Sequence, residues 1–233
     1  MRRSLLRETD GVYQFNFAPV FENFDQLLAG AWVTIQLSFG AMLIGLVVAI
    51  VCAVGKTAGP KPVRFLIDAY IELIRNTPFL IQIFFIYFAL PAFGLRLTPG
   101  SAALLALVVN VGAYATEIVR AGIESIPPGQ VEAGVALGLK RRQIFRYIVM
   151  KPALRTVYPA LTSQFIFLML TSSVVSVISA NDLAAAGNDL QSQTFASFEV
   201  YLVITAMYLA LSLGFSALFS LVQRAAFHYP MSR

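Results

Sequence analysis

Charged residues are spaced so widely along this chain that long apolar stretches separate them. A helix that crosses the hydrocarbon core of a bilayer needs about 20 consecutive residues without an uncompensated charge. Five intervals between successive charged residues reach that length: 26–55, 76–95, 97–116, 156–181 and 200–223. We therefore predict an all-α polytopic membrane protein with about five transmembrane helices, near 27–54, 65–91, 99–120, 156–179 and 200–223.

The composition supports a membrane protein and excludes several other classes. The chain is 58% hydrophobic and 12% charged, whereas a typical globular protein is about 25% charged. No hydrophilic stretch is long enough to fold alone, which excludes a single anchor with a large soluble domain. Cys52 and His228 are the only residues of their types, so the clusters needed for a zinc site or a thiol nucleophile are missing. We predict no metal site and no cofactor in this chain.

The basic residues of the loops form two unequal groups. Twelve lysines and arginines lie in the loops around 56–64 and 120–155 and at the C-terminus, whereas the other side holds four: Arg2, Arg3, Arg7 and Arg96. Loops rich in lysine and arginine next to a span face the cytoplasm, so the N-terminus is predicted outside and the C-terminus inside. Because this topology accounts for the net charge of +5, no nucleic-acid partner is predicted.

The same topology divides the chain into three parts. Residues 1–26 form an N-terminal extracytoplasmic segment, and residues 224–233 form a cytoplasmic C-terminal tail. The transmembrane domain, 27–223, contains a cytoplasmic loop at 121–155. Within the first span, small residues recur every four positions: Ala41, Gly45, Ala49 and Ala53. Such a strip lets another helix approach closely, and packing within the bundle is the preferred interpretation over a dedicated dimerisation face.

The second predicted span carries a polar stripe. At about 100° per residue, one arc of a helix holds four polar residues: Asp68, Glu72, Arg75 and Gln82. Charge inside the membrane is costly and marks substrate pathways by default. An ion pair between Glu72 and Arg75, at i and i+3, is an equally weighted structural alternative.

Polar residues also mark a kink in the second span and one face of the third. Pro78 removes a backbone hydrogen bond and frees carbonyls near Asn76 and Thr77, which suits a kink that lines a cavity. The third span presents a stripe of its own: Asn110, Tyr114 and Glu117. Two helices with polar stripes indicate a shared aqueous path, and we predict that the stripes form a translocation path.

The interval between Arg120 and Arg155 is too charged to enter the bilayer and predicts two short helices. The first opens at 127–129 and continues through 130–137, where Gly138 breaks it, and residues 141–150 form the second. Within this loop, Glu132-Ala133-Gly134, followed after three residues by Gly138, closely resembles the EAA loop of importer-type ABC transporter permeases. The resemblance implies docking to an ATPase subunit through four residues: Glu132, Ala133, Gly134 and Gly138.

The resemblance covers nearly the whole chain and is greatest to the polar amino acid (His/Glu/Gln/Arg/opine) permease family. The matching stretches are 72–78, Gln82, 113–120 and 129–133. It implies the type I ABC importer permease fold in the bacterial inner membrane. The implied partners are a second permease subunit, identical or related, two cytoplasmic ATPases that use ATP and Mg, an extracytoplasmic binding protein and a polar amino acid substrate.

Two departures from the family pattern affect this interpretation. The family loop usually ends Ile-x-Leu-Pro, whereas Pro152 here comes one residue late, and we expect it still to end the loop helix. In the fourth span, Met169 and Leu170 replace a common Lys-Asp pair, which weakens the case for a site for a substrate amino group in this subunit. The hydroxyl residues that follow are assigned to the path because a zwitterion needs polar groups to replace water: Thr171, Ser172 and Ser173.

Three hypotheses compete. An importer permease subunit fits the motifs and needs partners, because the chain has no ATPase motif. A self-sufficient secondary carrier would show inverted repeats and a midplane acid or histidine, and neither is visible. A membrane-embedded enzyme would need a nucleophile and a base at usable spacing. We favour the permease subunit, with the carrier as the alternative, and the sequence leaves open both homodimer and heterodimer.

The predicted topology can be tested by thiol labelling in intact cells. In a Cys52→Ala background, a cysteine introduced at Asn188 should react with a membrane-impermeant reagent, because the topology places it outside. A cysteine at Lys140 should react only after the membrane is opened. Labelling at position 140 but not at 188 in intact cells would reverse the orientation.

Overall fold

The computed structural model describes residues 15–226, and almost all of this range is helical, which confirms the all-α prediction. The predictions that involve Arg2, Arg3, Arg7, His228 and Arg233 fall outside the described residues. The α-helices are α1 (Ala18–Glu22), α2 (Phe24–Ala58), α3 (Lys61–Arg75), α4 (Phe79–Phe84), α5 (Pro99–Glu124), α6 (Pro128–Ala136), α7 (Arg141–Gln143), α8 (Met150–Thr171), α9 (Leu183–Thr194) and α10 (Ser197–Ala226). Shorter π and 3-10 segments are η1 (Phe85–Ala89), η2 (Leu90–Phe93), η3 (Ile144–Val149) and η4 (Ser172–Ile178).

Four helices of the described range are long and apolar enough to cross a membrane: α2, α5, the continuous helix Arg141–Ile178, and α10. A fifth span results if α3 and the following helix Phe79–Phe93 are counted as one bent pair. The two arms of this pair are bent by 109° at residues 76–78. The break at Pro78 was therefore predicted correctly, and the bend of 109° makes the predicted kinked span at 65–91 a broken span or a re-entrant loop.

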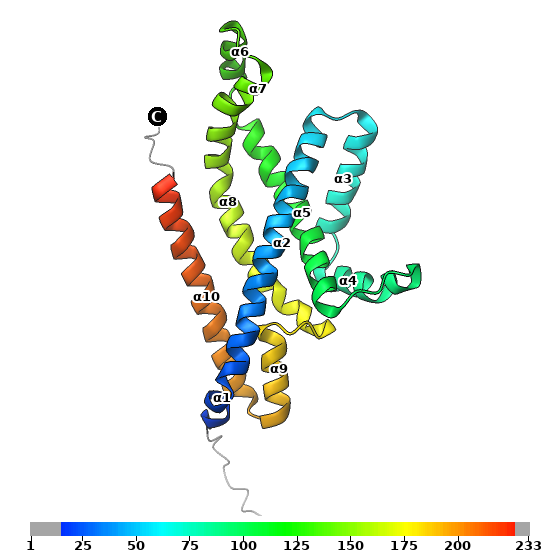
Figure 1. The fold of residues 1–233 in the computed structure, drawn as a ribbon, viewed down its shortest axis with the longest axis vertical. Coiled ribbons are helices and arrows are strands. Elements are labelled where there is room, and N and C mark those ends of the chain that lie inside the picture. Colours follow the sequence, from blue (N-terminus) through cyan, green and yellow to red (C-terminus); the bar gives the residue numbers. More distant parts are fainter. Residues whose placement is uncertain (1–14, 227–233) are drawn as a thin grey trace, which may run out of the picture.

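The long helices run side by side along one axis of the molecule (Figure 1). α2 is the central helix, since it packs against α5, α3, α8 and α9. The hairpin of α6 and α7 projects beyond one end of the bundle, and α1 and α9 lie at the opposite end. α4 leaves the bundle axis and runs to one side. This arrangement gives the molecule two chemically different ends.

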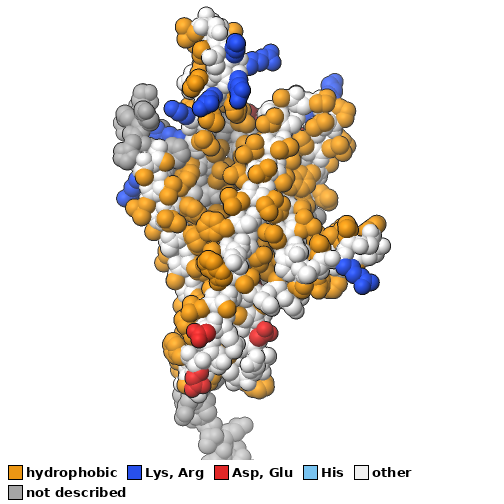
Figure 2. Space-filling view, viewed as in Figure 1, with side chains coloured by type: hydrophobic (Ala, Val, Ile, Leu, Met, Phe, Trp, Pro, Cys, Tyr) orange, Lys and Arg blue, Asp and Glu red, His pale blue; other side chains and the backbone are white. Residues whose placement is uncertain are grey.

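Charge is distributed unequally between these ends. On the face drawn in Figure 2, lysine and arginine gather around the projecting hairpin, and acidic side chains lie at the other end. The exposed acids in α1, α2 and α9 are Glu22, Asp25 and Asp189. Most of the surface between the two ends is apolar, as expected for a surface in contact with lipid.

The strip of small residues in α2 packs against α5. Ala41, Ala49 and Ala53 are fully buried, and a Cβ atom built on Gly45 would overlap the Val111 side chain of α5. This close approach is what small residues at a helix interface permit. The interpretation as an intramolecular packing surface is therefore confirmed.

Helix α9 is fixed at its N-terminus by polar contacts to two spans. The Leu183 amide donates to Thr34 Oγ1 of α2 at 3.1 Å. Asp182 caps the helix by accepting from the Ala185 amide at 2.9 Å, and the Tyr208 hydroxyl of α10 donates to it at 3.3 Å. Burial raises the pKa of the Asp182 carboxyl to about 6, although the amide donors oppose this shift. Acidification below this value protonates the carboxyl, which weakens it as an acceptor.

The end of the cytoplasmic loop differs from the prediction. Pro152 does not end a loop helix, because Arg141–Ile178 forms one continuous helix that contains Pro152. The six residues of η3 just before it, Ile144–Val149, follow a π-helical pattern. The altered bonding of a π segment accommodates a residue that cannot donate a backbone hydrogen bond. The predicted second loop helix is thus the first part of the fourth span.

The α2–α5 interface predicts a position-specific effect of added volume. Gly45→Ala should lower the thermal unfolding midpoint of the detergent-solubilised protein, because the new methyl group overlaps Val111 and overpacking costs about 1–3 kcal/mol. Gly214→Ala in α10 is the matched control, since no atom lies within 4 Å of its added Cβ. Equal midpoints for the two variants would contradict this account of the interface.

Candidate functional site

The bend in the second span is stabilised by one side chain, Gln82. Pro78 has no N–H, so it cannot donate to the Ile74 carbonyl one turn earlier. The Gln82 carboxamide donates to that carbonyl at 2.7 Å and to the Thr77 carbonyl at 3.0 Å. Its oxygen accepts from Asn110 Nδ2 of α5 at 3.0 Å. Gln82 therefore satisfies the backbone that the proline exposes and attaches the bend to α5.

The path role predicted for Gln82 stays a prediction. The side chain is only 8% exposed, and it does not line the polar pocket described below. The prediction placed it on the same arc as Glu72 by assuming a continuous helix. Because the chain bends by 109° between these positions, Glu72 and Gln82 lie on two different helices and do not share one helix face.

The residues before the bend hydrogen-bond among themselves. Asn76 Nδ2 donates to Glu72 Oε2 at 2.7 Å and to the Glu72 carbonyl at 2.8 Å. The Thr77 hydroxyl donates to the Leu73 carbonyl. Arg75 instead lies over the ring of Tyr114, 5.4 Å from its centroid. No ion pair in residues 15–226 joins Glu72 to Arg75, so the alternative of a structural ion pair is wrong.

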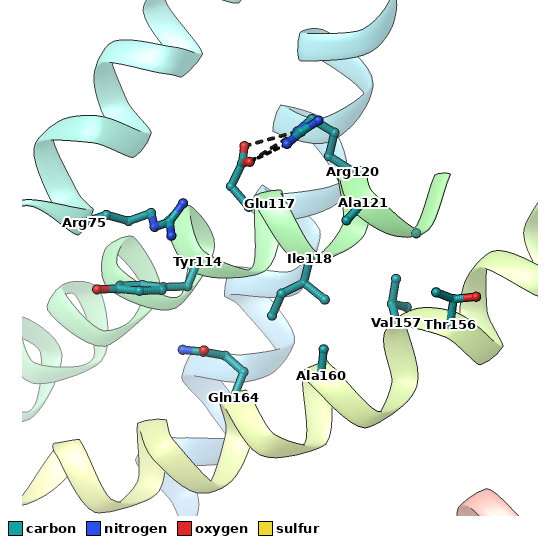
Figure 3. Close-up of a pocket in the computed structure, with 11 residues that line it drawn as sticks. Arg75, Tyr114, Glu117, Ile118, Arg120, Ala121, Thr156, Val157, Ala160 and Gln164 are labelled. Carbon is teal, nitrogen blue, oxygen red and sulfur yellow. Dashed lines mark hydrogen bonds and ion pairs between the residues drawn. The ribbon is translucent and has the colours of Figure 1, made fainter. Parts of the chain in front are cut away.

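An ion-pair network connects α2, α3 and α5 at the basic end of the bundle. Lys56 Nζ lies 2.8 Å from both Asp68 and Glu117, and Arg120 pairs with Glu117 at 2.7 Å. Arg120 also pairs with Glu124. Lys56 thus occupies Oε1 of Glu117 and Arg120 occupies Oε2. Figure 3 shows the contact between Glu117 and Arg120. The sequence reasoning missed this network because Lys56 and Glu117 are 61 residues apart.

A polar pocket of about 510 Å³ lies between α5 and α8. Figure 3 shows α5 and α8 facing each other across it, with Arg75 of α3 at one edge. The pocket brings together three residues of the predicted path, Arg75, Tyr114 and Glu117, and adds Gln164 and Thr156, which the sequence analysis did not single out. An isolated carboxamide in an apolar span was a usable signal for Gln164. The other lining residues are Ile118, Arg120, Ala121, Gly122, Val157 and Ala160.

The predicted hydroxyl segment lies outside this pocket. Ser172 is fully buried in η4, and its hydroxyl donates to the Met169 carbonyl at 2.7 Å. Ser173 donates in the same way to Leu170, at 2.8 Å. Thr171 is partly buried at the end of α8. A path role for these residues stays a prediction, and a bulky replacement at Ser172 would collide with the core.

The projecting hairpin depends on two glycines. Gly134 is buried, and a Cβ atom on it would lie 2.6 Å from Ile148 Cδ1, so glycine allows α6 to contact η3. Gly138 has φ +74°, a conformation that glycine adopts without strain, and it reverses the chain after α6. Glu132 and Ala133 are exposed on the hairpin. The sequence correctly predicted this break.

Comparisons with known proteins agree with the fold and the hairpin. Residues 41–228 match the family described as binding-protein-dependent transport system inner membrane component, and the chain belongs to this family. It is 34% identical over 213 residues to the glutamine transport system permease protein GlnP of Escherichia coli (strain K12), covering 91% of this chain and 97% of that protein. It is 33% identical to the nopaline transport system permease protein NocM of Agrobacterium fabrum, covering 88% and 89%.

Solved structures give the same result. The chain superposes on a crystal structure of an amino acid ABC transporter with histidines at a TM-score of 0.85 and 36% identity, covering 91% of this chain and 99% of that one. An inward-facing form of the MetNI methionine ABC transporter matches at 0.74 and 21% identity, covering 89% and 98%, and this likeness concerns the fold alone. The chain is thus a multi-pass permease subunit of an ABC importer, a class that works with ATPase subunits and a binding protein. The alternative of a self-sufficient carrier is not supported.

The bend makes a testable prediction about stability. Gln82→Leu should lower the thermal unfolding midpoint, because it leaves the Ile74 carbonyl and the Asn110 amide without their partner. Each buried polar group left unpaired costs about 1–3 kcal/mol. Gln223→Leu, at an exposed position of α10, is the matched control and should leave the midpoint unchanged. A Gln82→Leu protein as stable as this control would show that the bend does not depend on Gln82.

Proposed function

We propose that this chain forms one half of the membrane channel of an ATP-driven importer for a polar amino acid. The second half is an identical or related permease subunit. The proposal is supported by relatives that are named for glutamine, L-cystine and nopaline transport. Further support comes from the similarity to an amino acid ABC transporter.

The observation that carries the proposal is the hairpin of α6 and α7 beyond the basic end of the bundle (Figure 1). It exposes large apolar side chains, with Leu137 79% and Val135 62% exposed. Exposed apolar groups with a polar rim mark a protein interaction site. We assign this surface as the docking site for a cytoplasmic ATPase subunit. An importer with two permease subunits would thus bind two ATPase subunits, and these ATPases use ATP and Mg. Coupling is assigned to the predicted residues: Glu132, Ala133, Gly134 and Gly138.

The translocation path is assigned to the pocket between α5 and α8 and to the polar residues at the bend. Arg75, Tyr114 and Glu117 line this pocket, and Glu72, Asn76 and Thr77 lie next to Arg75 in the chain. In this proposal, the hydroxyl segment 171–173 and the buried Gln82 lie behind the residues that line the path and hold them in position. A zwitterion requires such polar groups in an otherwise apolar bundle.

The orientation follows from the charge distribution. The basic end with the hairpin faces the cytoplasm, and the acidic end with α1 and α9 faces the outside of a bacterial inner membrane. The binding protein would deliver its amino acid at the outer end. This places the N-terminus outside and the C-terminus in the cytoplasm.

The hairpin can be tested by substitution at its two open glycines. Gly138→Val should abolish co-purification of the ATPase and ATP-dependent uptake, because a β-branched residue is strained at φ +74° and the turn would change shape. Gly129→Val is the matched control, since its added Cβ also meets no atom within 4 Å and its φ is not positive. The permease itself should still insert into the membrane in both variants. Normal ATPase co-purification with Gly138→Val would contradict the assigned docking role.

A further inference from the structure

Gln164 of α8 is a buried donor without a partner. Its Nε2 is inaccessible to solvent and has no hydrogen-bond partner in the described part of the chain. The residue lines the pocket between α5 and α8, and Figure 3 shows its side chain reaching from α8 toward Tyr114. Buried amide N–H groups are almost always hydrogen-bonded. Because Nε2 is shielded from solvent in this conformation, the side chain has to turn into the pocket before the amide can donate to an acceptor oxygen of a ligand.

Arg75 is the second group in this pocket that has donors available for a ligand. Its guanidinium lies over the Tyr114 ring and makes no ion pair within residues 15–226. Arg120, the other cation of the pocket, is already paired with Glu117 and Glu124. A guanidinium with free donors binds a carboxylate in bidentate fashion.

The only acid in the pocket lining is already neutralised. Glu117 Oε1 is bound by Lys56 at 2.8 Å, and Oε2 is bound by Arg120 at 2.7 Å. It therefore has little capacity to receive a cationic side chain. The pocket offers a free cation and a free amide donor but no free carboxylate, so its polarity favours an anionic group.

We infer that this pocket binds a polar amino acid, with the substrate carboxylate at Arg75 and a substrate acceptor oxygen at Gln164, and that it discriminates against amino acids with a cationic side chain. The inference rests on the proposed function and adds a chemical preference and a residue to it. The volume of about 510 Å³ lies within the range of about 300–1,000 Å³ of small-molecule sites. Gln164 is then a specificity-determining residue that contacts the substrate on its way to the cytoplasm.

Direct binding to the permease–ATPase complex in nanodiscs, without the binding protein, tests the inference. The probe is labelled L-glutamine, measured by equilibrium dialysis. Gln164→Glu should weaken binding by at least about tenfold, because it places a carboxylate against the substrate oxygen, and Gln164→Leu should weaken it by a smaller factor through loss of the donor. The matched control Gln223→Glu, at an exposed position of α10, should bind as the wild type does.

Competition on the wild-type complex gives a second test that requires no variant. Unlabelled L-glutamine should displace the probe, whereas L-glutaminamide, which lacks the carboxylate, and L-lysine should compete at least about tenfold more weakly. Equal competition by L-glutaminamide, or wild-type binding by both Gln164 variants, would overturn the inference. Such a result would mean that the substrate carboxylate or Gln164 makes no contact that contributes to binding.

Uptake into proteoliposomes separates this inference from the proposed function. The complete importer with its binding protein should take up L-glutamine in an ATP-dependent manner. If the wild type takes up no amino acid, the proposed function fails. If uptake is normal but the complex shows no binding of L-glutamine, the inference alone is overturned.

Discussion

A chain in hydrocarbon has to pair its own backbone N–H and C=O groups, and the break after α3 is the place where regular helix bonding cannot do so. Pro78 cannot donate to the Ile74 carbonyl, and the Gln82 carboxamide donates instead. The same side chain is bound by Asn110 of α5. The 109° bend is thus tied to the third span, and the end of α3 presents Arg75 to Tyr114. Without this substitute donor, the Ile74 carbonyl at the turn that positions Arg75 would be left without a hydrogen-bond partner.

The walls of the pocket are held by close helix contacts and by charge. α5 contacts α2 along the strip of small residues, and it contacts α8 where Gly122 leaves no room for a methyl group beside Val157. The Lys56–Glu117 pair links α5 to α2, and the Lys56–Asp68 pair adds α3. These contacts fix the helix ends around the pocket. They also neutralise Glu117, which is why the free charge of the pocket belongs to Arg75.

The sequence predicted features that depend on local spacing and missed those that depend on the folded chain. Charge spacing located the spans, and Gly138 indicated the turn of the hairpin, because both signals lie within short stretches. The Lys56–Glu117 pair and the contact of Gln82 with Asn110 join residues far apart in the chain. The stripe containing Gln82 failed because the periodicity argument assumed a continuous helix. Pro152 was misjudged for a related reason, since a π-helical segment keeps the helix intact.

The continuous helix Arg141–Ile178 connects the hairpin to the pocket. Its first residues lie in the hairpin, its middle carries Thr156 and Gln164 on the pocket wall, and its end forms η4 in the core. A rigid helix transmits a displacement along its length, so a movement of the hairpin would shift Gln164 relative to Tyr114 on α5. Two of the places where this helix departs from regular bonding, η3 and Pro159, lie between the hairpin and Gln164. Bending there would set how much of the movement reaches the pocket.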